Sequence, residues 1–125
     1  MTQKTKNIIG WVLTGILAFA LIASASMKLT GGEELAKNAA AFGLTAGTLK
    51  IIGVLEIICI LFFIIPRTGL LGTLLVAAYL GGAIVTHMEH GQPIIAPLII
   101  QCLVWITAAI RFPELSRRLL GNKVA

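Results

Sequence analysis

Four long apolar runs dominate the chain and favour a fold that lies within a membrane. The runs cover residues 7–27, 51–66, 68–88 and 90–110, and their only ionisable side chains, cysteines and tyrosine aside, are Glu56, His87 and His90. A helix that crosses a bilayer core of about 30 Å needs around 20 residues at 1.5 Å each. We therefore predict an all-α, polytopic membrane protein, a four-transmembrane-helix bundle in a single domain of residues 1–125, with helices at about 8–28, 48–66, 68–88 and 93–111.

The charge content excludes several classes of protein. Only 12% of the 125 residues are charged and 58% are hydrophobic, whereas an average soluble domain has about a quarter of its residues charged. So few charges cannot cover a water-soluble surface, which argues against soluble enzymes and disordered tails. The ten Lys and Arg stand mostly at the ends of the apolar runs and form no basic stripe, so we expect membrane lipid and not nucleic acid as a partner. No run alternates with period two, which argues against membrane strands.

The distribution of Lys and Arg predicts the orientation of the helices. With the N-terminus inside, seven fall on the inner side (Lys4, Lys6, Arg67, Arg111, Arg117, Arg118 and Lys123) and three on the outer side (Lys28, Lys37 and Lys50). We therefore expect a multi-pass protein of the plasma (inner) membrane with both termini in the cytoplasm. The first run also resembles a signal peptide, with a basic start and Ala23-Ser24-Ala25. It is longer than the usual apolar region of 7–15 residues, however, so we expect a retained helix.

The first loop is long enough to hold a short helix, at about residues 31–42. Thr30 and Glu33 have the spacing of a capping box, Glu33 and Lys37 are an i,i+4 pair, and Gly43 is placed to end the helix. We expect this helix to lie on the outer membrane surface. It would serve as a connector or as a lid.

Polar side chains at membrane depth are costly, and each is by default a candidate functional residue. Glu56 lies roughly 10 Å and Gln101 roughly 12 Å below the outer boundary, counted at 1.5 Å per residue. Lys28 and His87 reach that boundary at the ends of their helices. Because Cα–Cβ bonds tilt toward a helix's N-terminus, Lys28 and His87 lean inward while Glu56 and Gln101 lean outward.

The four side chains should therefore lie close together, with a Lys28–Glu56 ion pair if the two meet. With Ser24 and Thr86 they would form a polar pocket in the outer half of the bundle: Ser24, Lys28, Glu56, Thr86, His87 and Gln101. Structural alternatives exist for three of these residues. Lys28 could extend to the headgroups, Glu56 could make an interhelical bond, and Gln101 could join two helices.

Other polar and small residues favour structure over chemistry. His87-Met-Glu-His90 matches no common zinc motif, so we expect no metal site. Cys59 and Cys102 do not form a Cys-x-x-Cys motif and are expected to be buried structural thiols. The pairs Ala77/Gly81 and Ala78/Gly82 would allow a neighbouring helix to approach closely.

Four short segments resemble the DoxX-like family of small four-helix membrane proteins: Ser26-Met27-Lys28-Leu29, Gly53-Val-Leu-Glu56, Pro66-Arg67-Thr-Gly69 and Gly82-Ala83-Ile-Val-Thr86-His87. Their order and spacing carry the resemblance, from about Trp11 to Trp105. The positions that match the family pattern are Lys28, Glu56, Thr86 and His87. The resemblance implies a link to redox systems, since the family's namesakes are associated with a thiosulfate:quinone oxidoreductase and other members accompany membrane or periplasmic redox systems. Distant animal relatives act as chaperones or cargo receptors.

These observations lead to three hypotheses about function. The first is a redox-linked membrane subunit whose pocket binds a quinone-like or other lipophilic molecule or lipid. No redox cofactor site is visible, so electrons would come from a membrane or periplasmic oxidoreductase and the chain would lack activity of its own. The second is a non-catalytic assembly factor or chaperone, and the third a small proton-coupled exporter. A homo-oligomer is compatible with all three.

Overall fold

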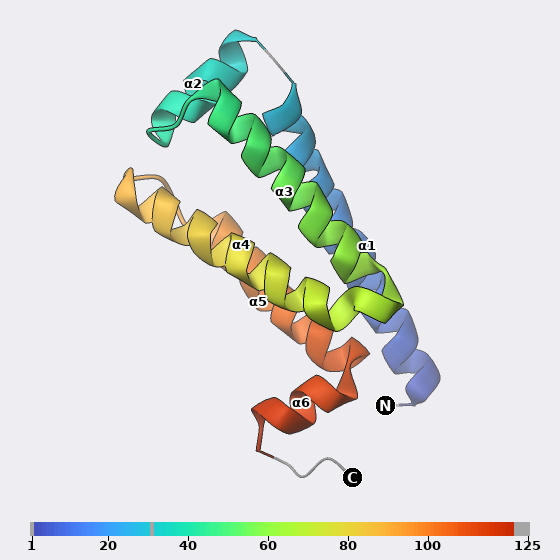
Figure 1. The fold of residues 1–125 in the computed structure, drawn as a ribbon. Coiled ribbons are helices and arrows are strands. Elements are labelled where there is room, and N and C mark those ends of the chain that lie inside the picture. Colours follow the sequence, from blue (N-terminus) through green and yellow to red (C-terminus); the bar gives the residue numbers. More distant parts are fainter. Residues whose placement is uncertain (1, 31, 122–125) are drawn as a thin grey trace.

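The structure, a computed structural model, describes residues 2–30 and 32–121. It is all-α and 87% helical, with no strand among the described residues. Long helices are joined by short segments (Figure 1). The long helices are α1 (Gln3–Leu29), α3 (Ala46–Ile64), α4 (Gly69–Glu89) and α5 (Ile95–Arg111), and the short elements are α2 (Glu33–Ala41), the 3₁₀ turn η1 (Pro66–Thr68) and α6 (Pro113–Leu119).

Three or four of these helices are long and apolar enough to cross a membrane. Within the described residues, α1, α3 and the η1–α4 segment meet this test singly. The shorter α5 meets it only with α6, and the two are bent by 111° at Phe112 and Pro113. Large apolar side chains also remain on the outside of the helices, such as Phe19 at 78% and Ile51 at 62% exposure. Exposed apolar surface on this scale is typical of a protein that faces lipid.

The long helices pack as a ring of neighbours. Helix α1 contacts α3 and α5, and α4 contacts the same two helices. The α1/α3 pair and the α4/α5 pair lie close together near the α3–α4 turn and diverge toward the end that carries α2 (Figure 1). The core between them is apolar and consists of Leu17, Leu21, Ile60, Phe63, Val76, Leu80 and Val104.

The close end depends on glycine. A Cβ atom on Gly72 of α4 would lie 2.2 Å from the backbone nitrogen of Phe63 in α3, so only glycine permits this crossing. The prediction of close packing at Gly81 and Gly82 was wrong for this chain, because a Cβ at either position would meet nothing within 4 Å among the described residues.

The helix ends differ from the predicted ones by a few residues. Helix α1 begins earlier than predicted because the Thr2 side chain caps it, accepting a hydrogen bond from the backbone N–H of Thr5. Thr45 caps α3 in the same way, through the N–H of Thr48. Helix α3 ends at Ile64, shortly before Pro66, since a proline disfavours helical geometry in the residue before it.

Helix α2 is present but does not have the predicted cap. Its N-cap is Gly32, at a φ of 112°, with no side-chain cap hydrogen bond, while the hydroxyl of Thr30 donates to the carbonyl of Ser26 instead. Gly31 lies outside the described residues. The predicted stop at Gly43 is confirmed, with a φ of 68°. Leu35 and Ala39 are buried against Leu49, so α2 packs on the start of α3.

Candidate functional site

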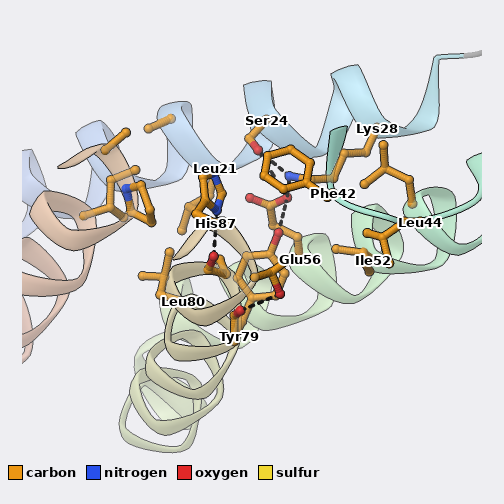
Figure 2. Close-up of a pocket in the computed structure, with 18 residues that line it drawn as sticks. Leu21, Ser24, Lys28, Phe42, Leu44, Ile52, Glu56, Tyr79, Leu80 and His87 are labelled. Carbon is orange, nitrogen blue, oxygen red and sulfur yellow. Dashed lines mark hydrogen bonds and ion pairs between the residues drawn. The ribbon is translucent and has the colours of Figure 1, made fainter. Parts of the chain in front are cut away.

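A cavity of about 500 Å³ is lined by the C-terminal parts of α1 and α4 and the N-terminal parts of α3 and α5. This is the end at which the helix pairs diverge (Figure 1). It is lined by residues of α1, α3, α4 and α5, and by Phe42 and Leu44 from the segment between α2 and α3. Most of its wall is apolar. Five of the six predicted site residues line it: Ser24, Lys28, Glu56, Thr86 and His87 (Figure 2).

The carboxylate of Glu56 is the centre of the polar wall. Its Oε1 atom accepts hydrogen bonds from Lys28 Nζ at 2.8 Å, from the Tyr79 hydroxyl at 3.0 Å and from Ser24 Oγ at 3.4 Å (Figure 2). Lys28 Nζ also donates to Ser24 Oγ at 2.6 Å. The predicted Lys28–Glu56 ion pair is therefore present, and the alternative in which Lys28 extends to the headgroups is not what the structure shows.

This network ties three helices together, because its residues come from α1, α3 and α4. The Glu56 side chain is only 2% exposed and that of Lys28 is 21% exposed. A carboxylate buried this deeply needs a cation and hydrogen-bond donors to stay ionised. Here Lys28 supplies the charge, and Ser24 and Tyr79 supply further donors.

Tyr79 was not predicted as a site residue, although the sequence carries a signal for it. Glu56 lies eleven residues before Arg67 and Tyr79 lies twelve after it. Two antiparallel helices joined at that turn place such residues at the same depth. A tyrosine side chain is mostly apolar and is common in apolar runs, so its hydroxyl is a weaker signal of a polar site than a charged or amide side chain.

His87 and Thr86 line the cavity but do not belong to the network around Glu56. His87 Nδ1 lies 2.6 Å from the carbonyl oxygen of Ala83, one turn earlier in α4. The imidazole ring packs against Phe42, with ring centroids 4.6 Å apart and planes tilted by 58°. The Thr86 hydroxyl donates to the carbonyl of Gly82 at 2.8 Å. Both side chains are thus held by their own helix.

Gln101 does not line the cavity, contrary to the prediction. Its Nε2 donates to the carbonyl of Ala77 at 3.0 Å and so joins α5 to α4, the structural alternative. Its Oε1 is the one buried side-chain oxygen or nitrogen without a hydrogen-bond partner among the described residues.

The cysteines are also placed differently from the prediction. Cys102 is exposed on α5 and Cys59 is half-buried on α3, so neither is the fully buried thiol that was expected. In an apolar sequence a mid-helix cysteine fits a lipid-facing position as well as a core position. Residues 2–30 and 32–121 contain no group of three or more His, Cys, Asp or Glu side chains that could hold a metal ion.

A second polar cluster, which the sequence did not predict, surrounds Arg111 at the close end. Its guanidinium donates to the carbonyls of Phe63 at 2.8 Å and Ile64 at 3.3 Å, and to Thr14 Oγ1 at 3.3 Å. Its Cζ lies 4.7–5.1 Å from the ring centroids of Trp11, Phe63 and Phe112. Arg111 thus satisfies carbonyls at the C-terminus of α3 that have no partner within that helix, and this is a structural role.

Comparison with known proteins places the chain in a family without adding a characterised relative. No curated protein and no solved structure matches it. The model of the DoxX-like family matches residues 12–109, which include the Glu56 network, His87 and every residue that lines the cavity. Since the match covers well over half of the 125 residues, the chain belongs to the DoxX-like family.

Proposed function

We propose that this protein spans the plasma membrane with α1, α3, α4 and α5 as a four-helix bundle, with both termini in the cytoplasm and α2 on the outer surface. The excess of Lys and Arg on the inner side supports this orientation. The cations of α6 follow a sharp bend, which lets this segment lie along the inner surface. The cavity then opens in the outer half of the bundle.

We propose further that the cavity binds a lipophilic small molecule by its polar head. The observation that carries this is a carboxylate, Glu56, buried to 2% exposure yet lining a cavity of about 500 Å³ with mostly apolar walls. A few polar groups in an apolar cavity of several hundred Å³ are typical of small-molecule sites. A quinone-like molecule or a lipid fits this description, and the chain would serve as the membrane subunit of a redox system.

A membrane assembly factor or chaperone is the second candidate. The observation that favours it is the hydrogen bonding of Glu56 Oε1, which three donors from α1 and α4 already satisfy. A hydrogen-bond network of this kind can have a purely structural role, in which it holds the helices together and binds no ligand.

Thermal unfolding with added lipid and quinone extracts separates the two candidates. A ligand at a hundredfold excess over Kd stabilises the folded state by about 2.7 kcal/mol. We expect such an extract to raise the Tm of the parent more than the Tm of Glu56→Gln or His87→Ala. Native mass spectrometry should identify the bound molecule. The control is His90→Ala, because His90 is exposed and does not line the cavity.

The opposite result would favour the assembly factor. In that case no extract shifts the parent, and the two substitutions simply lower its Tm.

A further inference from the structure

The hydrogen bonding around Glu56 is one-sided. All three donors, from Ser24, Lys28 and Tyr79, reach Oε1. Oε2 accepts no hydrogen bond from the described residues and is not among the buried atoms without a partner, so it is not fully buried, and Glu56 itself lines the cavity. An ionised carboxylate can only accept hydrogen bonds. The cavity therefore presents a free, anionic acceptor.

His87 adds a second free acceptor. Its Nδ1 lies 2.6 Å from the carbonyl oxygen of Ala83, and because a carbonyl only accepts, Nδ1 must carry the proton. In the neutral ring the other nitrogen, Nε2, is then an acceptor. Nε2 has no hydrogen bond with the described residues. Like Glu56 Oε2, it is not among the buried atoms without a partner, so it is not fully buried.

Donors are scarce on the same wall. The Thr86 hydroxyl hydrogen is engaged by Gly82, and the Tyr79 hydroxyl hydrogen by Glu56. Lys28 Nζ has three N–H bonds, of which Ser24 and Glu56 take two. Among the described residues on this wall, one ammonium hydrogen is thus the donor left over, against two free acceptors.

From this excess of hydrogen-bond acceptors over donors we propose that the cavity recognises a lipophilic hydroxyl compound, a phenol or an alcohol. It does so in preference to the ether or carbonyl compound of the same shape. The proposal rests on the proposed ligand-binding function and specifies its ligand class. The hydroxyl donates to Glu56 Oε2 and its oxygen accepts from the remaining N–H of Lys28. Within the quinone class this selects the reduced, hydroxyl-bearing form.

A carbonyl or ether oxygen fits this site poorly. It can accept from Lys28, but its lone pairs then face those of Oε2, and that carboxylate oxygen, now covered by the ligand, stays without a donor. An amine cation fits poorly for a different reason. Lys28 already balances the charge of Glu56 at 2.8 Å, so a second cation at Oε2 would be repelled by the ammonium group.

Matched probes test the proposal on the unmodified protein. The probes are 4-octylphenol, its methyl ether 4-octylanisole, and the ketone 4-octylacetophenone, which share one tail and one ring. Equimolar pairs compete for the purified protein in detergent, and native mass spectrometry gives the bound ratio. A hydrogen bond to a charged group predicts that the phenol binds about tenfold to a hundredfold tighter than the ether or the ketone.

Glu56→Gln supplies the reference for partitioning into detergent. Its amide offers hydrogens as well as an oxygen, so we expect the phenol preference to fall at least fivefold, while His90→Ala keeps the parent ratio. Circular dichroism checks that each variant is helical. If Glu56→Gln does not fold, the ratio of probes bound to the parent still tests hydroxyl selectivity.

The outcomes distinguish this inference from the proposed function. If all three probes bind the parent equally, or the ether or ketone binds tighter, hydroxyl selectivity is wrong and a lipophilic site remains. If no probe binds and no extract shifts the Tm, both proposals are wrong.

Discussion

The two halves of the Lys28–Glu56 ion pair differ in their access to water. Lys28 stands next to the last residue of α1 and is 21% exposed, whereas Glu56 is 2% exposed in the middle of α3. If Glu56 is neutralised, the ammonium group of Lys28 can extend toward the headgroups. If Lys28 is removed, the carboxylate has no such escape and must stay uncompensated or take up a proton.

We therefore expect Lys28→Met to destabilise the protein more than Glu56→Gln does. Loss of one partner of a buried pair costs about 3–5 kcal/mol, and less if the carboxyl becomes protonated. The double variant should lose less unfolding free energy than the sum of the losses of the two single variants. Unfolding free energies of the four proteins in detergent measure this coupling, and strict additivity would show that the pair does not interact.

Arg111 binds two carbonyls and a hydroxyl with one planar group, which a lysine cannot reproduce. We expect Arg111→Lys to lower the free energy of unfolding by about 2–3 kcal/mol, since carbonyls at the end of α3 lose their donors. The control is Arg67→Lys, at an exposed position, which should change stability by less than about 0.5 kcal/mol. If both substitutions lowered the free energy of unfolding equally, the structural role assigned to Arg111 would be wrong.

Helices α3 and α4 depend on one glycine for their contact. A methyl group at Gly72 would lie 2.2–2.4 Å from backbone atoms of Phe62 and Phe63, and backbone cannot move aside as a flexible side chain can. At Gly81 of the same helix the space is open, so an alanine there gains only its better helix propensity.

Gly72→Ala and Gly81→Ala form a matched pair on one helix. We expect Gly72→Ala to destabilise the protein by about 1–3 kcal/mol or more, because the two helices must separate. Gly81→Ala should be neutral or stabilising by up to about 1 kcal/mol. Thermal unfolding of both variants tests the packing, and a destabilising Gly81→Ala would indicate that a second molecule covers that face.

The molecule as a whole has a tightly packed end and a hollow end. The packed end holds Arg111 and Gly72, and the hollow end holds the cavity, which Phe42 and His87 line. In the proposed orientation the hollow end faces outward, where a lipophilic molecule can enter from the outer leaflet.

Cysteine labelling in intact cells tests that orientation. In a background that lacks Cys59 and Cys102, an impermeant thiol reagent should label Lys37→Cys without permeabilisation. Lys4→Cys and Arg118→Cys should react only after the membrane is opened. Labelling of Lys4→Cys in intact cells would reverse the proposed topology.

The sequence by itself predicted the four long helices and α2, but not α6, and it predicted at which level along its helix each polar residue lies. Depth follows from counting along an apolar run at 1.5 Å per residue. This count alone predicts that Lys28, Glu56, His87 and Gln101 lie in the same half of the bundle. The resemblance to the DoxX-like family rested on four short sequence segments, and the match of the family model confirmed it.

The tertiary structure alone decided which face of each helix meets which neighbour. In a soluble helix, polar residues mark the outer face. Here lipid is as apolar as the core, so the pattern carries almost no information about rotation around the helix axis. Gln101 has the right depth but faces α4, Tyr79 has the right depth and faces Glu56, and the close glycine is Gly72 instead of Gly81. These choices follow from packing between helices, which a hydropathy pattern does not record.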